Sequence, residues 1–115
     1  MESRTLAIRY AQILNEKKAS DVFVLDISPL TTIADYFVIA SGSSNLQVQA
    51  LANTLIDKAE EDGARPLRVE GLREGAWVLL DFGTVVVHVF KNDIREFYGL
   101  ERLWGDAERV DAQLD

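Results

Sequence analysis

Apolar and polar positions repeat along the chain with two different periods, and each change of period marks a predicted element. Residues 5–18 place apolar side chains three and four positions apart, on one side of a helix. The stretch from Ser44 to Gly63 repeats that spacing, with Ser44 and Gln47 forming a capping box and glycine suiting the position after a helix. Its last turn, residues 60–62, is entirely acidic, which the helix dipole disfavours, and the sequence shows no compensating residue.

Shorter runs rich in β-branched and aromatic residues predict strands. The first two runs read VFVLDIS and DYFVIAS, and the second is apolar on both faces, as in a central strand. The last two strands form a hairpin around Phe82 and Gly83. The predicted strands cover residues 21–28, 35–41, 67–70, 77–81 and 84–90.

The order of elements predicts the fold class. A final helical stretch over residues 93–104, broken or kinked at Gly99, completes the order α-β-β-α-β-β-β-α. This order predicts an α/β fold with a mixed β-sheet and helices packed against it, in two layers or in three if the helices divide between the faces. We expect one domain, residues 1–105, followed by a polar C-terminal tail, residues 106–115, that frays.

Composition narrows the class of protein. The chain has 115 residues, 48% hydrophobic and 27% charged, as in a globular domain. It has no cysteine, which excludes disulfides and thiolate chemistry. No apolar run is long enough to cross a membrane and no signal peptide is evident, so we expect a cytoplasmic location. The net charge of −7 argues against direct nucleic-acid binding and favours a basic protein partner.

Isolated candidates for catalysis are better explained as structural residues. His88 is the only histidine and shares a strand face with Val86 and Phe90. Without cysteine or a second histidine, a structural role is favoured over a base or metal ligand, although His88 could orient a carboxylate. Asp26 and Asp35 lie in or beside apolar strands, where we expect hydrogen bonds to loop N–H groups rather than a catalytic pair.

Gly42 and Ser43 lie between a strand and a helix, as in an anion site. Nucleotidyltransferase folds hold a triphosphate at such a turn and bind Mg²⁺ with two acids on the next strand. Here the strands LRVEGL and WVLLDF carry one acid each, Glu70 and Asp81. We therefore predict a nucleotidyltransferase-like framework without catalysis, metal or cofactor. The alternative is a nucleotide binder or residual enzyme that uses Gly42, Ser43 and Asp81.

The first strand of the hairpin carries a candidate binding face. Trp77, Leu79 and Asp81 alternate onto one face, and Val78 and Leu80 onto the other. If helices cover the second face, the first exposes an aromatic anchor, an apolar neighbour and a carboxylate, which is the composition of a binding hot spot. A second helix would instead bury the tryptophan. The acidic net charge favours the binding face.

Four segments together resemble the ribosomal silencing factor family, also called Iojap-like. They read DYFVIASG, RPLRVEG, WVLLDFGTVVVHVF and REFYGLERLW, and they cover nearly the whole chain in the family's order and spacing. The resemblance implies a nucleotidyltransferase-like fold without known catalysis. It also implies binding to the large ribosomal subunit through its fourteenth large-subunit protein, which blocks joining of the small subunit and represses translation under nutrient limitation. Family members are also often homodimers when free.

The resemblance also implies which residues meet the partner. We expect Trp77 and Leu79 to pack against apolar residues of the partner, and the two acids to meet its arginines or lysines. Tyr98 fits either the core or an interface. A dimeric scaffold unrelated to ribosomes is a third reading, and it rests only on the exposed apolar face. The expected partner-binding residues are Glu70, Trp77, Leu79, Asp81 and Tyr98, with His88 in support.

Overall fold

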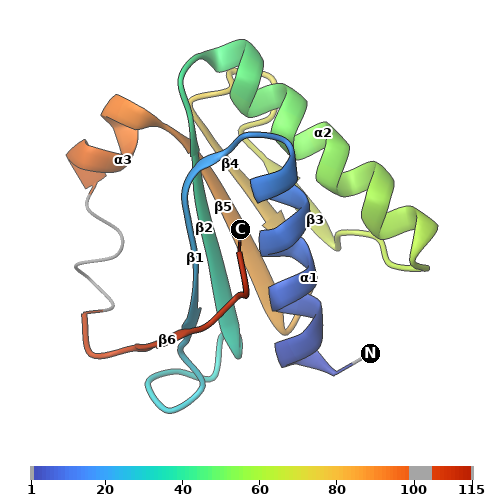
Figure 1. Ribbon diagram of the computed structural model, residues 1–115, viewed down its shortest axis with the longest axis vertical. Coiled ribbons are helices and arrows are strands. Elements are labelled where there is room, and N and C mark those ends of the chain that lie inside the picture. Colours follow the sequence, from blue (N-terminus) through green and yellow to red (C-terminus); the bar gives the residue numbers. More distant parts are fainter. Residues whose placement is uncertain (1, 99–104, 115) are drawn as a thin grey trace.

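The computed structural model describes residues 2–98 and 105–114, and their side chains except those of residues 96–98. These residues form three helices and one six-stranded sheet (Figure 1). The elements are α1 (Ser3–Glu16), β1 (Ser20–Asp26), β2 (Tyr36–Gly42), α2 (Asn45–Glu61), β3 (Arg68–Glu70), β4 (Trp77–Asp81), β5 (Val85–Lys91), α3 (Asn92–Tyr98) and β6 (Glu108–Val110).

The sheet has the strand order β3-β4-β5-β2-β1-β6. Strands β2 and β5 run parallel, and the other neighbouring strands are antiparallel. This confirms the prediction of an α/β fold with a mixed sheet. Every residue of β2 after Tyr36 is buried, as expected for a strand whose two faces are both apolar.

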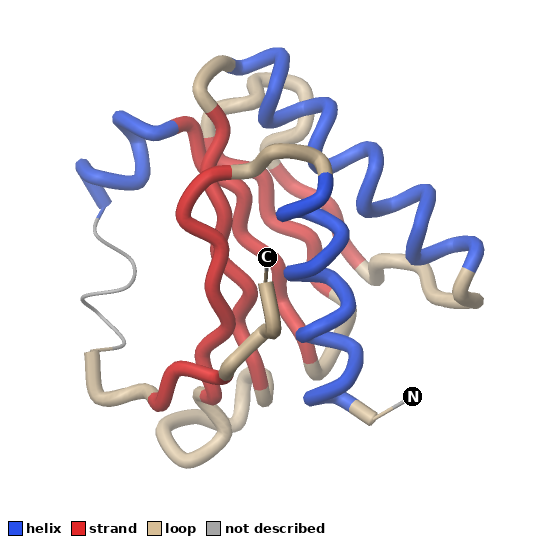
Figure 2. The backbone as a smooth tube through the Cα atoms, in the orientation of Figure 1, coloured by secondary structure: helices blue, strands red, loops and turns tan. Residues whose placement is uncertain are grey.

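The helices divide between the two faces of the sheet. Helices α1 and α2 cover one face, and α3 lies on the other side (Figures 1 and 2). The core under α1 and α2 is the larger, and the opposite face has a smaller core to which α3 contributes Ile94. The fully buried side chains of the first core include Tyr10, Leu14, Leu51, Leu55, Val38 and Leu80.

The ends of α2 follow the predicted capping pattern with one change. Ser44 Oγ accepts a hydrogen bond from the backbone N–H of Gln47 at 3.1 Å. The Gln47 side chain returns to the N–H of Ser43, one residue before the N-cap, so the capping box is displaced. Gly63 follows the C-cap with φ +86, a left-handed conformation that favours glycine.

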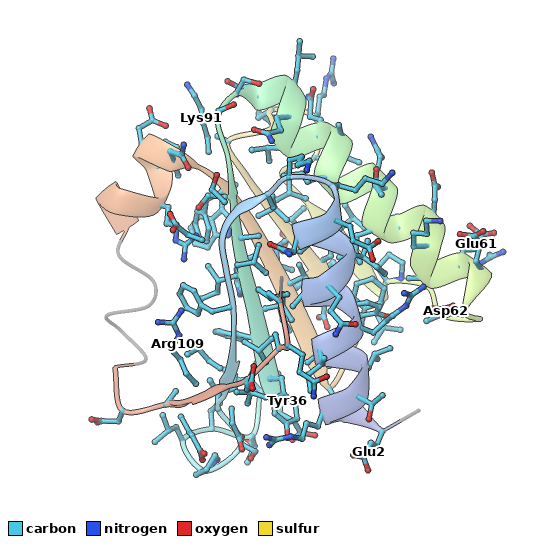
Figure 3. All side chains as sticks on the ribbon, viewed as in Figure 1. Glu2, Tyr36, Glu61, Asp62, Lys91 and Arg109 are labelled. Atoms are coloured by element: carbon cyan, nitrogen blue, oxygen red, sulfur yellow. The ribbon has the colours of Figure 1, made fainter. Side chains whose placement is uncertain are left out.

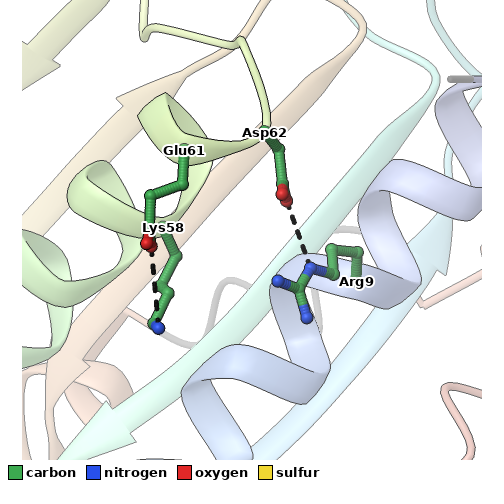
Figure 4. Close-up of polar contacts among 4 residues, drawn as sticks. All are labelled: Arg9, Lys58, Glu61 and Asp62. Carbon is green, nitrogen blue, oxygen red and sulfur yellow. Dashed lines mark hydrogen bonds and ion pairs between the residues drawn. The ribbon is translucent and has the colours of Figure 1, made fainter.

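The acidic end of α2 has cationic partners that the sequence did not reveal. Asp62 pairs with Arg9 of α1 at 3.2 Å, and Lys58 lies 3.6 Å from Glu61 (Figure 4). A third pair joins Glu60 to an arginine in the following loop at 3.4 Å. These pairs are largely exposed, so each contributes at most about 1 kcal/mol. They offset the unfavourable position of the acids at this end of the helix dipole.

The C-terminal segment corrects the expectation of a frayed tail. Residues 108–110 form β6, which pairs antiparallel with β1 at the edge of the sheet. Val110 and Ala112 are 7% and 6% exposed and join the core under α1. Gln12 Nε2 of α1 also donates a hydrogen bond to the Ala112 carbonyl at 3.2 Å. This part of the chain therefore belongs to the fold.

The predicted last helix is described only as far as Tyr98, where α3 ends. The expected kink at Gly99, and the side chains of Leu100 and Trp104, lie outside the described residues. Among the helices that the structure describes, none is long and apolar enough to span a bilayer.

Candidate protein-binding face

Strand β4 has one face toward the helices and one face away from them. Val78 and Leu80 are fully buried under α1 and α2, which confirms the predicted alternation. Trp77 and Leu79 point to the opposite side and are partly buried there. The tryptophan is therefore half-buried. The sequence left open whether it would be exposed or covered by a second helix, and the structure lies between these two outcomes.

Strand β3 extends this surface with two charged side chains. Glu70 lies directly opposite Leu79, and Arg68 directly opposite Asp81. Residues in register on neighbouring strands point to the same face. The β3–β4 face, as we call it, consists of Arg68, Glu70, Trp77, Leu79 and Asp81.

Arg68 lies between the two carboxylates of this face, a role that sequence reasoning missed. Its Nε is 3.3 Å from Glu70 Oε2, and its Nη2 is 4.0 Å from Asp81 Oδ2. Asp81 also accepts a hydrogen bond from the Gly83 N–H at 2.8 Å, which ties it to the hairpin turn. Strand alternation could have placed Arg68 on the same face as Glu70, because it precedes Glu70 by two positions, but not beside Asp81. The β3–β4 face thus carries two acidic side chains and one basic side chain.

A hydrogen bond from the neighbouring strand holds the indole of Trp77. Trp77 Nε1 donates to Nδ1 of His88 at 3.2 Å. The indole also stacks on Phe90, with ring centroids 4.9 Å apart, and Phe37 lies edge-on to the imidazole at 4.7 Å. His88, which the sequence predicted to support the binding residues, thus lies next to the indole of Trp77 on the neighbouring strand. Its acceptor nitrogen faces the indole rather than a carboxylate.

Burial sets the protonation state of this histidine. His88 is 4% exposed, and burial lowers the pKa of its imidazole from 6.5 to about 4. The ring is therefore neutral at pH 7, which leaves Nδ1 able to accept the indole hydrogen bond. Nε2 has no hydrogen-bond partner among the residues that the structure describes. This geometry supports a structural role for His88.

The turn beside Trp77 requires glycine. Gly71 follows β3 with φ +78, and a Cβ at this position would collide with the carbonyl oxygen of Trp77. Glycine alone avoids both the backbone strain and the collision. The close approach of this turn helps to fix the start of β4, where the indole begins the β3–β4 face.

Tyr98 is the last residue of α3, and its side chain lies outside the described residues. The structure thus brings four of the five expected partner-binding residues onto one face and leaves the place of the Tyr98 side chain a prediction.

The residues of the alternative nucleotide site lie far apart. Gly42 is in register with Lys91 at one end of β5, and Asp81 with Val86 at the other. Five residues of strand separate these levels, about 17 Å. Ser43 Oγ donates to the Gln47 side chain at 2.8 Å, as part of the start of α2. Within the described residues, no three His, Asp or Glu side chains gather as metal ligands.

The two aspartates beside the apolar strands take part in loop and hairpin contacts. Asp26 Oδ1 accepts hydrogen bonds from the N–H and the hydroxyl of Ser28, at 3.1 and 2.7 Å, as predicted for a loop-facing carboxylate. The backbone N–H of Asp35 donates to the Thr84 carbonyl at 2.8 Å, which ties this end of β2 to the β4–β5 hairpin.

Comparison with known proteins identifies the family. The profile described as "Ribosomal silencing factor during starvation" matches residues 1–115. The chain belongs to the ribosomal silencing factor family. It is similar to the ribosomal silencing factor RsfS of Bacillus subtilis, with 43% identity over 114 residues that cover 99% of this chain and 97% of that protein.

A solved structure and a more distant relative extend the comparison. The fold matches the crystal structure of a protein from Chromobacterium violaceum with a TM-score of 0.88 and 40% identity, over 91% of this chain and 88% of that one. A mouse protein named "Mitochondrial assembly of ribosomal large subunit protein 1" is 33% identical over 95 residues, 80% of this chain and 42% of that protein. The silencing factor family is thus confirmed and is a regulatory one, whereas the nucleotidyltransferase-like label stays a prediction.

Proposed function

We propose that this member of the silencing factor family binds the large ribosomal subunit through its fourteenth large-subunit protein. The bound protein blocks joining of the small subunit and so represses translation under nutrient limitation. The observation that carries the proposal is the β3–β4 face, where Trp77 is held by His88 beside Leu79 and two carboxylates. An aromatic anchor in a fixed orientation loses little entropy on binding, which favours affinity.

Charge supports a basic protein as the partner. The chain has a net charge of −7, and the Glu70 side chain on the β3–β4 face is 58% exposed. Trp77 and Leu79 pack against apolar residues of the partner, and Glu70 and Asp81 meet its arginines or lysines. Opposite charges at the rim of such a contact raise the rate of association and set its orientation. Tyr98 completes the proposed interface.

The proposed mechanism is steric. The chain measures 34 × 33 × 29 Å. A body of this size on the joining surface of the large subunit excludes the small subunit by volume alone. Its potency then depends on affinity and residence time rather than on a reaction, and the protein acts as a repressor and not as an enzyme. The mouse relative named for large-subunit assembly supports the choice of subunit.

Sedimentation with purified ribosomal subunits tests the proposal. The protein is expected to comigrate with large subunits and to reduce the fraction of joined ribosomes when small subunits are added. A protein that is folded by circular dichroism but does not comigrate would overturn the proposal. The homodimer implied by the resemblance stays a prediction, which analytical ultracentrifugation of the free protein measures.

A further inference from the structure

A pocket of about 770 Å³ lies beside β1, away from the β3–β4 face. Its described walls come from β1, the end of β2, the start of α3 and the segment leading into β6. Strands β5 and β2 separate it from β4 in the strand order. The volume lies within the range of pockets that bind small molecules.

A buried arginine forms one wall of this pocket. Arg95 is only 7% exposed, and its Nη1 donates to Ser41 Oγ and to the carbonyl of Asp21, at 2.5 and 2.9 Å. Its guanidinium also lies over the ring of Phe23, 4.8 Å from the centroid. These contacts from β1 and β2 hold the cation at a fixed position in the pocket wall.

A second arginine reaches the same aromatic ring from β6. The guanidinium of Arg109 is 4.4 Å from the centroid of Phe23. Figure 3 shows Arg109 on the side of β1 that faces away from α1, which agrees with its register opposite Leu25. No carboxylate among the described residues forms an ion pair with it. Within the described part of the chain, its donors are therefore available to a ligand.

The pocket lining is mainly cationic, whereas the chain as a whole is acidic. Among the described lining residues there are two guanidinium groups and one carboxylate, that of Asp21, whereas the protein carries a net charge of −7. Asn92 adds an amide donor, and Leu25 and Ala107 add apolar wall. The planar fork of a guanidinium matches the oxygens of a phosphate group. A cationic wall beside an apolar one fits an anion with an uncharged body.

We propose that this pocket binds a phosphate-bearing small molecule of up to nucleotide size. Phosphate oxygens accept hydrogen bonds from Arg109, and Arg95 adds positive charge from its fixed position. The uncharged part of the ligand lies against Leu25 and Ala107. Strands β5 and β2 lie between this site and the β3–β4 face, whereas α3 contributes both Arg95 to the pocket and Tyr98 to the proposed ribosome contact.

Calorimetry on the free protein tests the proposal with inorganic pyrophosphate, GMP and GTP. Saturable binding of at least one probe is expected, and Arg109→Met should weaken it at least about tenfold because a charge-assisted hydrogen bond is lost. Asp21→Asn should strengthen it by about two- to fivefold, since a like charge near the phosphate is removed. Asparagine tolerates the left-handed backbone of Asp21, which has φ +48.

Arg65→Met is the matched control, because it removes the same charge from a side chain that is 81% exposed and outside the pocket. It should leave binding unchanged. If Arg65→Met and Arg109→Met weaken ligand binding equally, the binding is a non-specific attraction to positive charge. That result would overturn the proposed site. Absence of binding by all three probes at millimolar concentration, with folded protein, would also overturn it.

The probes distinguish the two sources of the phosphate group. Equal affinity for pyrophosphate and GTP supports a site for the phosphate group itself, and tighter binding of a nucleotide supports contact with its uncharged part. No ribosome is present in these measurements. Their failure would therefore leave the proposed subunit binding untouched, and failure of subunit binding would leave this pocket untouched.

Discussion

The indole nitrogen of Trp77 donates a hydrogen bond to Nδ1 of His88 on the neighbouring strand, at 3.2 Å. The two residues are diagonal neighbours, because Trp77 is in register with Phe90 and His88 with Leu79. A buried, neutral imidazole thus orients an aromatic side chain on a partly open face. The only histidine of the chain, which invites a catalytic reading, instead orients the side chain that we propose as the binding anchor.

Trp77→Ala is expected to weaken binding to the large subunit by about 2 kcal/mol, or about 30-fold, because it removes the proposed central anchor. Quantitative sedimentation with large subunits measures the change. Leu46→Ala serves as the control, since Leu46 of α2 is 78% exposed and lies outside the β3–β4 face. Unchanged affinity of the folded Trp77→Ala protein would show that the β3–β4 face is not the contact.

His88 is expected to make the fold sensitive to mild acid. Its pKa is lowered to about 4 in the folded protein, against 6.5 for the ordinary side chain, so the unfolded chain takes up the proton first. The stability gained by keeping the imidazole neutral is complete above pH 6.5 and is lost as the pH falls toward 4. At pH 4.5 the free energy of unfolding is therefore lower by roughly 2–3 kcal/mol than at neutral pH, through this histidine alone.

Urea unfolding of wild type and His88→Gln at pH 7 and pH 4.5 measures this sensitivity. Glutamine does not titrate, and its amide oxygen can still accept the hydrogen bond from Trp77. Wild type is expected to lose more stability than the variant between the two pH values, while the carboxylates contribute alike to both. Equal losses would mean that His88 does not titrate as its burial implies.

Local periodicity predicted most of the fold because it reflects which face of each element is buried. The alternation of Trp77 and Val78 placed β4 correctly, and the apolar run of β2 placed that strand at the centre of the sheet. The pattern failed for β6, whose three residues have only Val110 turned to the core. Such a strand depends on pairing with β1, which no local pattern contains.

The same limit applies to the candidate sites. The face with Leu79 and Asp81 followed from alternation within one strand, and Glu70 followed from the family resemblance. The bridging position of Arg68 required the register between β3 and β4. The phosphate pocket combines Arg109 with residues more than eighty positions earlier in the chain, so it could be recognised only in three dimensions.

Val110→Ala is expected to destabilise the protein by about 1–2 kcal/mol, because it removes buried methyl groups between β6 and α1. Glu108→Ala is the matched control on the same strand, at an exposed position, and should change stability by less than about 0.5 kcal/mol. Urea unfolding followed by circular dichroism measures both. Equal, small effects would mean that the C-terminal segment frays in solution, as its composition first suggested.

Arg68→Met is expected to strengthen binding to the large subunit by about two- to fivefold. The guanidinium of Arg68 holds Glu70 and Asp81, and its removal leaves both carboxylates available to cations of the partner. Arg65→Met makes the same change in net charge at an exposed side chain paired with Glu60, so the difference between the variants isolates the local effect. Competition sedimentation of each variant against wild type resolves such ratios. Weaker binding of Arg68→Met would mean that Arg68 itself contacts the partner, and it would overturn the assignment of the two acids as the groups that meet its basic side chains.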